Sequence, residues 1–261
     1  TDIRTWSSPN NLDEGVSLLC DILDSFSRVG MLMGMESQLR MSMLDLNVIV
    51  NKTKIDLIDC SLIVQSLRMI KSENEIELIG KICEITSTAF NEIPNIVYSG
   101  QSFEEATKEF RVSLFRNGAE DVPYLVGGLG NGGYNDIISP VDQRKIGKGS
   151  LLMFDTGSTY KGYFSDFDRN FGFDKVSSET MKTYELLWNS IKLAMSVARP
   201  GKTVSQVFYE INSYLGASHS SVGRYGHGVG LQLTEPPSIA YWDETILSDG
   251  MVLAIEPSFF M

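Results

Sequence analysis

Residues 151–173 of the chain read LLMFDTGSTYKGYFSDFDRNFGF, and this stretch decides the fold. An apolar, β-rich run leads to Asp155, the chain turns at Gly162, and a second run carries Asp166. Two such runs around a glycine turn are typical of a β-hairpin. Carboxylates among apolar strand residues are costly unless a partner compensates them, and a bound divalent cation is one such partner. The alternative is a pair of solvated strand charges beside Arg169.

The totals describe a globular chain and exclude several classes of partner. Its 261 residues fit one large domain or two medium ones, and 43% of them are apolar. The net charge is −11, and no Lys/Arg run is longer than two residues. We therefore expect no nucleic-acid partner and no anionic membrane surface as a partner. No apolar stretch reaches the roughly 18 residues of a membrane helix, and no secretory signal opens the sequence.

The three cysteines, Cys20, Cys60 and Cys83, are scattered along the chain. None belongs to a Cys-x-x-Cys pair, so no zinc knuckle or redox motif is predicted. An odd, scattered set is typical of reduced thiols, and we expect a cytoplasmic protein.

The first 66 residues are predicted to form a small α/β unit. Helical spacing of apolar residues runs from Leu12 to Arg28, and a short buried strand follows over residues 29–34. A weaker helix is predicted over residues 37–47 and another strand over residues 48–50. No catalytic set of residues is visible in this part of the sequence.

From Ser72 onward the pattern of helix, helix and strands occurs twice. Each half has a long helix, a glycine, a second capped helix and then strands, which suggests an internal duplication. Capping patterns open three of the helices: Ser72-x-x-Glu75, Ser102-x-x-Glu105 and Thr203-x-x-Gln206. Two half-sheets related in this way would form a curved platform on which polar side chains from both halves converge.

The second half supplies two further candidates. Of the two histidines, His219 and His227, only His227 lies between glycines, which let a backbone approach a ligand closely. Glu256 ends an apolar strand, as Asp155 does. A lone histidine is more often a packed or surface residue. Taken together, four residues form an oxygen-rich set that suits manganese, iron, cobalt or zinc, often as a metal pair: Asp155, Asp166, His227 and Glu256.

At these residues the chain resembles the pita-bread metallopeptidase superfamily, which includes methionine aminopeptidase, prolidase, aminopeptidase P and the metal-free creatinase. The matching blocks are Asp155-Thr-Gly157 with Gly162-Tyr163-x-x-Asp166-x-x-Arg169, then residues 226–231 (GHGVGL) and residues 250–257 (GMVLAIEP). Residues 67–76 (LRMIKSENEI) resemble the junction found in the prolidase and creatinase branch.

The resemblance implies the architecture. We expect an α+β pita-bread fold with an internal pseudo-twofold duplication over residues 67–261, its C-terminal end missing. Residues 1–66 would be the C-terminal part of a creatinase/prolidase-type N-terminal domain. The resemblance also implies a homodimer.

The resemblance implies two divalent metal ions (manganese, cobalt, iron or zinc), or none if the protein is creatinase-like. Asp155, Asp166, His227 and Glu256 would hold them, with His227 and Glu256 also catalytic and Glu256 moving a proton to the leaving amine. The family has a histidine before the first aspartate, where this chain reads Asn135-Asp136-Ile137, and another where this chain has Thr234. Candidates to replace their substrate contacts are Asp136, Thr234 and Glu235.

Two other departures concern the metal side. Asp168 stands where the family usually has threonine, and it would adjust the metal site or pair with Arg169 or Arg144. The last metal carboxylate of the family would fall after Met261.

The function expected from these residues is that of a metal-dependent hydrolase of the prolidase-like branch. Such an enzyme cleaves an amide bond in a small substrate, for example an Xaa-Pro dipeptide. One alternative is a non-peptidase relative, creatinase-like or a lyase, that acts on a small nitrogen or sulfur compound. A second alternative is an inactive binding module.

Overall fold

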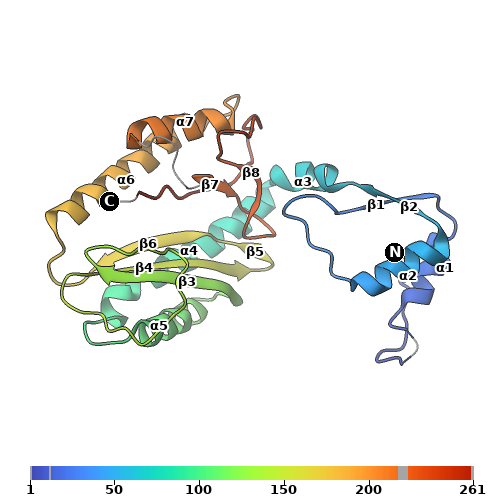
Figure 1. Cartoon of the computed structure of the whole chain (residues 1–261), viewed down its shortest axis with the longest axis horizontal. Helices are drawn as coiled ribbons and strands as arrows, with labels where there is room; N and C mark the ends of the chain where they lie inside the picture. The colour runs from blue at the N-terminus through green and yellow to red at the C-terminus, as the bar shows by residue number, and fades with distance from the viewer. Residues whose placement is uncertain (1, 12, 217–222, 260–261) are drawn as a thin grey trace. The chain divides into compact units, whose positions relative to one another are not determined.

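The computed structural model describes residues 2–11, 13–216 and 223–259 of the chain. Its contacts divide it into two units, Thr1–Leu67 and Arg68–Met261. Helices and strands are mixed in both units, which confirms the expected α+β class (Figure 1).

The first unit is a small α/β arrangement. Its strands β1 (Arg28–Met31) and β2 (Asp56–Asp59) are parallel, with Arg28 opposite Asp56. Helices α1 (Val16–Leu23) and α2 (Met43–Thr53) pack on each other, and α3 (Ser61–Met69) leads into the second unit. The small core comprises Val16, Cys20, Ile49 and Ile55.

The prediction of a helix over residues 37–47 followed by a strand over residues 48–50 was wrong. Helix α2 begins after Ser42, whose hydroxyl accepts a hydrogen bond from the backbone N–H of Asp45. The helix continues through the β-branched run to Thr53, and Ile49 is only 2% exposed in the core. Burial against neighbouring elements therefore outweighs the strand preference of that run.

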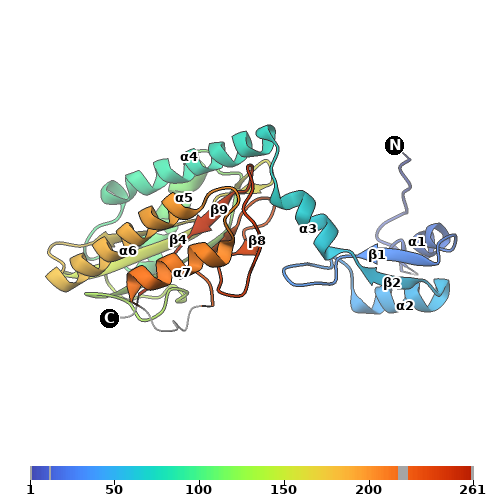
Figure 2. The same cartoon turned by 90° about the horizontal axis from the view of Figure 1, so that it is seen from above.

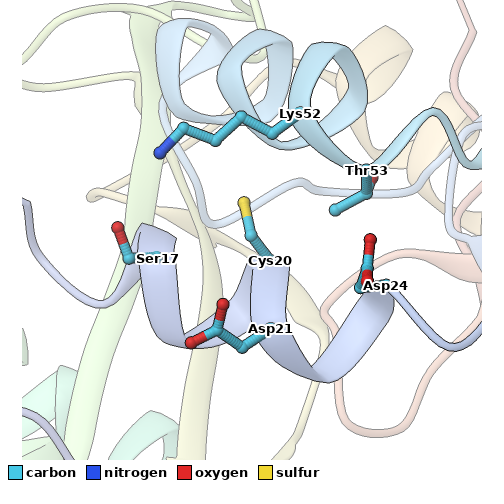
Figure 3. A pocket seen from close by; sticks show the side chains of 6 residues that line it. All are labelled: Ser17, Cys20, Asp21, Asp24, Lys52 and Thr53. Carbon is cyan, nitrogen blue, oxygen red and sulfur yellow. The ribbon is translucent and has the colours of Figure 1, made fainter.

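A shallow cavity of about 280 Å³ lies between α1 and α2 (Figure 3). The residues that line it are Ser17, Cys20, Asp21, Asp24, Lys52 and Thr53. None of the four residues predicted to bind metal belongs to this lining.

The second unit carries the remaining elements. Its helices are α4 (Glu73–Ile96), α5 (Phe103–Arg116), α6 (Ser178–Val197) and α7 (Val204–Leu215). Its strands are β3 (Asp121–Asn131), β4 (Ser150–Tyr160), β5 (Tyr163–Phe164), β6 (Phe167–Gly172), β7 (Gly226–Gly228), β8 (Glu235–Ser238) and β9 (Leu253–Ile255).

The antiparallel sheet of the first half has β4 at its centre, between β3 on one side and β5 and β6 on the other. Helices α4 and α5 pack on one face of this sheet (Figure 1). That face is apolar because alternate residues of β4, such as Leu152 and Phe154, point into a core shared with both helices. The stretch from residue 151 to 173 is the predicted hairpin.

The second half has a smaller sheet in the order β8-β7-β9. Helices α6 and α7 lie side by side (Figure 2), and residues from both contribute to a second core around the fully buried Tyr225.

The predicted duplication is visible as a repeated hydrogen-bond frame. The N–H of Gly100 donates to the carbonyl of Ile146, and Gly201 donates in the same way to Leu247. All three predicted capping boxes form, one opening α4, one opening α5 and one opening α7. Two further backbone hydrogen bonds of the first half recur in the second half at the same separation along the chain. The N–H of Phe103 donates to Arg144 as that of Val204 does to Thr245, and the N–H of Glu104 donates to Asp142 as that of Ser205 does to Asp243.

No helix in the described part of the chain is both long and apolar enough to cross a membrane.

The core between α5 and the larger sheet can be tested at Phe110. This residue is fully buried, and its ring centroid lies 4.6 Å from that of Phe90 and 5.0 Å from that of Phe154. We expect Phe110→Ala to lower the free energy of unfolding by about 3–5 kcal/mol, because it removes these contacts and leaves a cavity. Urea denaturation followed by circular dichroism measures the change.

Phe115, on the same helix but 45% exposed, provides the matched control. Phe115→Ala should change the free energy of unfolding by less than about 0.5 kcal/mol. Equal losses for the two variants would contradict the described packing of α5.

Candidate metal centre

Strand alternation sets the candidate carboxylates on the face of the larger sheet away from α4 and α5. Asp155 lies on β4 between the core-facing Phe154 and Thr156, so its side chain points to the opposite face. Directly across the ladder, Asp168 of β6 is its partner in register. The alternation of side chains along the strands, with Phe154 and Phe167 in the core, therefore places the acidic groups on the other face.

Three candidates converge on one point. Asp166, His227 and Glu256 each offer one potential ligand atom, and these three atoms lie within 4.8 Å of one another. The His227 Nε2 atom lies 3.3 Å from Asp166 Oδ2 and 3.3 Å from Glu256 Oε1. Asp166 precedes β6, whereas His227 belongs to β7 and Glu256 follows β9. Both halves of the duplicated unit thus contribute to the cluster.

His227 is held in an orientation suited to metal binding. Its Nδ1 atom lies 3.0 Å from the carbonyl oxygen of Gly228, which can only accept a hydrogen bond. A proton on Nδ1 satisfies this contact, so Nε2 is the ring nitrogen directed at the two carboxylates, where a metal ion could take the place of its proton. The flanking glycine is required: Gly226 has φ 150°, and a Cβ there would lie 2.1 Å from the carbonyl oxygen of Ala254.

Asp155 has one partnered and one unpartnered oxygen. The hydroxyl of Tyr124 donates to its Oδ2 atom at 3.3 Å. Its Oδ1 atom is buried and has no hydrogen-bond partner among the described residues. A buried carboxylate oxygen without a partner is costly, and a bound cation would compensate it. The donor set, oxygen-rich with one imidazole nitrogen, fits a divalent metal ion.

Without a cation, these acidic groups hold their protons tightly. Burial, together with Asp166, Asp168 and Glu256, raises the pKa of Asp155 to about 8. Burial and Glu256 raise the pKa of Asp166 to about 7, and the same two causes raise the pKa of Asp168 to about 6. Burial alone would lower the pKa of His227, but Glu256, Gly228 and Asp166 raise it above its ordinary value.

Glu235, predicted to contact substrate, is part of a buried ion-pair network. Its carboxylate is 3% exposed, forms a salt bridge with Arg68, and lies 3.3 Å from the Nζ atom of Lys71. It also accepts a hydrogen bond from the backbone N–H of Gln232. Both oxygens are therefore engaged, and the residue fastens the beginning of β8 to the start of the second unit. Its contact with substrate stays a prediction.

The other two predicted substrate residues lie outside the cluster. Asp136 is exposed, and its Oδ1 atom accepts a hydrogen bond from the N–H of Ile138. Thr234 is half-buried and precedes β8. Within the described residues, no hydrogen bond joins either side chain to Asp166, His227 or Glu256. His219 falls in residues 217–222, outside the described part.

Two residues near the cluster were not predicted in these positions. Tyr124 stands two residues before Val126, the register partner of Asp155, so it shares the face of that carboxylate. Asp168 was noted as a departure, but its register opposite Asp155 was not predicted. Once the strand register is known, the alternation of side chains along β3 and β6 shows that Tyr124 and Asp168 lie on the same face as Asp155.

Residues 77–261 match the sequence profile of metallopeptidase family M24, and the chain belongs to this family. It is 30% identical over 203 residues to an Xaa-Pro dipeptidase of Pyrococcus furiosus, covering 76% of this chain and 58% of that protein. It is 27% identical over 208 residues to a probable dipeptidase PepE of Mycobacterium tuberculosis, covering 76% of this chain and 54% of that protein. The chain thus spans little more than half the length of these curated relatives.

Solved structures agree with the sequence comparisons. The prolidase from Pyrococcus furiosus superposes with a TM-score of 0.80 at 25% identity, covering 91% of this chain and 70% of that chain. An X-Pro aminopeptidase from Thermotoga maritima shares the fold, with a TM-score of 0.81 at 21% identity over 93% of this chain and 68% of that one. The expected pita-bread fold and the expected family are therefore confirmed.

The contribution of Glu235 to the stability of the fold can be tested with the variant Glu235→Gln. The variant leaves the ammonium group of Lys71, whose side chain is 2% exposed, buried without its charge partner. We expect the free energy of unfolding to fall by about 3–5 kcal/mol in urea titrations. The exposed Glu244→Gln serves as the control and should be neutral. Unchanged stability of Glu235→Gln together with a weakened affinity for substrate would show that the substrate role was correct.

The raised pKa values predict how stability depends on pH. A carboxyl group whose pKa is raised in the folded state binds protons that the unfolded chain releases, so its stabilising effect is lost as pH rises through the folded pKa. The loss begins at the ordinary aspartate pKa of 3.8 and ends at the folded-state pKa, which is about 8 for Asp155, about 7 for Asp166 and about 6 for Asp168. Differential scanning calorimetry of the EDTA-treated protein should show the Tm falling between about pH 4 and 8.

The slope should be smaller in Asp155→Asn, which cannot titrate at that position. Saturating Mn²⁺ should also reduce the slope in the unsubstituted protein, because a bound cation favours the ionised carboxylates. A Tm that is constant or rises across this range would contradict the described electrostatics.

Proposed function

We propose that this protein is a metal-dependent dipeptidase that cleaves the amide bond of a small substrate such as an Xaa-Pro dipeptide. The observation that carries the proposal is the convergence of Asp166, His227 and Glu256 within 4.8 Å in a chain of metallopeptidase family M24. The relatives described above are named as Xaa-Pro dipeptidase, prolidase or dipeptidase, which supports this substrate class.

The proposed cofactor is a pair of divalent ions, with manganese, cobalt, iron or zinc as candidates. Asp155, Asp166, His227 and Glu256 are the proposed ligands. The buried, unpartnered Oδ1 atom of Asp155 and the position of His227 Nε2, 3.3 Å from both Asp166 and Glu256, support this assignment. When bound, such ions supply Lewis-acid polarisation of the scissile carbonyl and lower the pKa of an attacking water.

Glu256 is the proposed proton carrier. Its side chain is 31% exposed, compared with 6% for Asp166, so it is the more accessible of the two carboxylates beside His227. An accessible carboxylate can take a proton from the attacking water and return it to the leaving amine. His227 fixes the position of this carboxylate, since its Nε2 atom lies 3.3 Å from Glu256 Oε1.

The substrate side is proposed to use Asp136 and Thr234 in place of the histidines that related enzymes have there. The exposed position of Asp136 and the half-buried position of Thr234 are compatible with contact to a small ligand. The alternative functions, a creatinase-like or lyase-type enzyme and an inactive binding module, gain no support from the named relatives. They remain as outcomes of the test below.

The organisation of the chain is proposed as follows. Residues 1–66 correspond to the C-terminal part of the N-terminal domain of prolidase-type enzymes, and residues 67–261 correspond to the catalytic domain. The protein acts in the cytoplasm as a homodimer. Its three free cysteines are consistent with a reducing compartment.

The proposal is tested by metal content and dipeptide hydrolysis. Protein dialysed against MnCl₂ or CoCl₂ should retain metal by inductively coupled plasma mass spectrometry and should hydrolyse Gly-Pro. Asp166→Ala should lose the metal, and its kcat/KM should fall by at least about a hundredfold, a loss typical when a charge-stabilising or proton-transfer group is removed.

Asp249→Ala is the matched control, because Asp249 is an exposed aspartate of the same unit. It should retain both metal and activity. Metal without Gly-Pro hydrolysis would contradict the dipeptidase proposal and favour the small nitrogen or sulfur compound. Protein without metal would favour the creatinase-like or inactive alternative.

A further inference from the structure

The carboxylate of Asp168 is not one of the proposed metal ligands. It lies on β6 directly opposite Asp155 of β4, in an antiparallel ladder. Side chains opposite each other in such a ladder project from the same face and lie close together, and like charges in this position destabilise the sheet. Asp166, two residues earlier, adds a third negative group. A cation on that face would relieve this repulsion while both carboxylates are ionised.

The charge of the neighbouring cation lowers the pKa of Asp168, but among the described residues it forms no ion pair with that carboxylate. Arg169 follows Asp168 on the strand and therefore projects from the opposite face. Its guanidinium carbon lies 4.9 Å from the ring centroid of Phe167 and 5.9 Å from that of Phe90, and its Nη1 atom donates to the backbone carbonyl of Asp168. Arg144, the other predicted partner, pairs with Asp142 and also donates to the carbonyl of Leu129.

Neutral donors are also committed elsewhere. The hydroxyl of Tyr134 donates to Asn170 at 2.8 Å, and that of Tyr124 donates to Asp155. Among the described residues, no hydrogen bond or ion pair reaches the Asp168 carboxylate. The opposing Asp155 is in the same situation at its Oδ1 atom, which is buried and has no partner. Two facing carboxylates with free oxygens thus border the cluster of Asp166, His227 and Glu256.

We propose that Asp168 is an additional ligand of the metal centre and that it shares a divalent cation with Asp155. This inference rests on the proposed function in that it assumes that cations bind at the cluster. With Asp168 included, the centre has four carboxylates and a neutral imidazole, and their formal charge balances two divalent cations. A set this rich in carboxylate oxygen favours a hard ion such as Mn²⁺ over Zn²⁺.

A ligand role and a structural role for Asp168 predict opposite effects on the metal-free protein. If Asp168 binds a cation, removing its charge relieves repulsion from Asp155, so the metal-free variant should be at least as stable as the unsubstituted protein. If Asp168 instead maintains the fold through its own contacts, the metal-free variant should be less stable. Metal affinity and metal-free stability therefore have to be measured on the same variants.

The test is isothermal titration of EDTA-treated full chain with Mn²⁺, combined with calorimetric Tm values without metal. Asp168→Asn should lose one bound Mn²⁺ or bind it at least about tenfold more weakly, since even groups that only orient a metal ligand are worth about 10–100-fold in affinity. Its metal-free Tm should equal or exceed that of the unsubstituted protein. Asp168→Ser serves as a second variant in case the first fails to fold.

Asp174→Asn is the matched control, because Asp174 is exposed shortly after β6 and has a φ of 57°, which asparagine also adopts readily. It should bind Mn²⁺ as the unsubstituted protein does. Unchanged stoichiometry and affinity in both Asp168 variants would overturn the inference, as would a lowered metal-free Tm with intact Mn²⁺ binding. Mn²⁺ binding that depends on Asp168, in a protein that does not hydrolyse Gly-Pro, would contradict the proposed function and leave this inference intact.

Discussion

Repulsion between buried carboxylates is the constraint on which the second unit depends. Asp155 and Asp168 oppose each other across the β4–β6 ladder, and Asp166 and Glu256 lie near them. Burial and mutual repulsion raise the pKa values of the three aspartates to between about 6 and about 8. Gathering such groups lowers the stability of the protein by itself, so the rest of the fold has to hold them in place until a cation neutralises them.

The fold meets this constraint from both of its halves. One half provides the rigid sheet on which the aspartates stand, backed by the apolar core under α4 and α5. The other half provides His227 on β7 and Glu256 directly after β9, and these two strands pair with each other. The buried pair of Lys71 and Glu235 fastens the beginning of β8 to the residues just before α4. Such a pair contributes little net stability but makes one arrangement much better than the alternatives.

The sequence predicts the parts of this structure that depend on local patterns. Capping boxes such as Ser72 with Glu75 identify helix starts because cap and partner are three residues apart. Spacing and glycine brackets identify the cluster residues, including His227, because these signals lie within a few positions of each other. The interaction of Glu235 with Lys71 could not be predicted, since it joins residues that are 164 positions apart. The helix at Ile49 was missed for a related reason, because burial against α1 overrides local strand preference.

The central claim is that the carboxylates and His227 are kept together for a divalent cation. A crystal of the full chain grown with Mn²⁺, measured at the manganese absorption edge, tests it directly. The account predicts an anomalous difference peak within about 2.5 Å of Asp166, His227 Nε2 and Glu256, the range over which such ions bind protein oxygen and nitrogen. A map with no peak there, or with manganese only at exposed surface carboxylates, would contradict it.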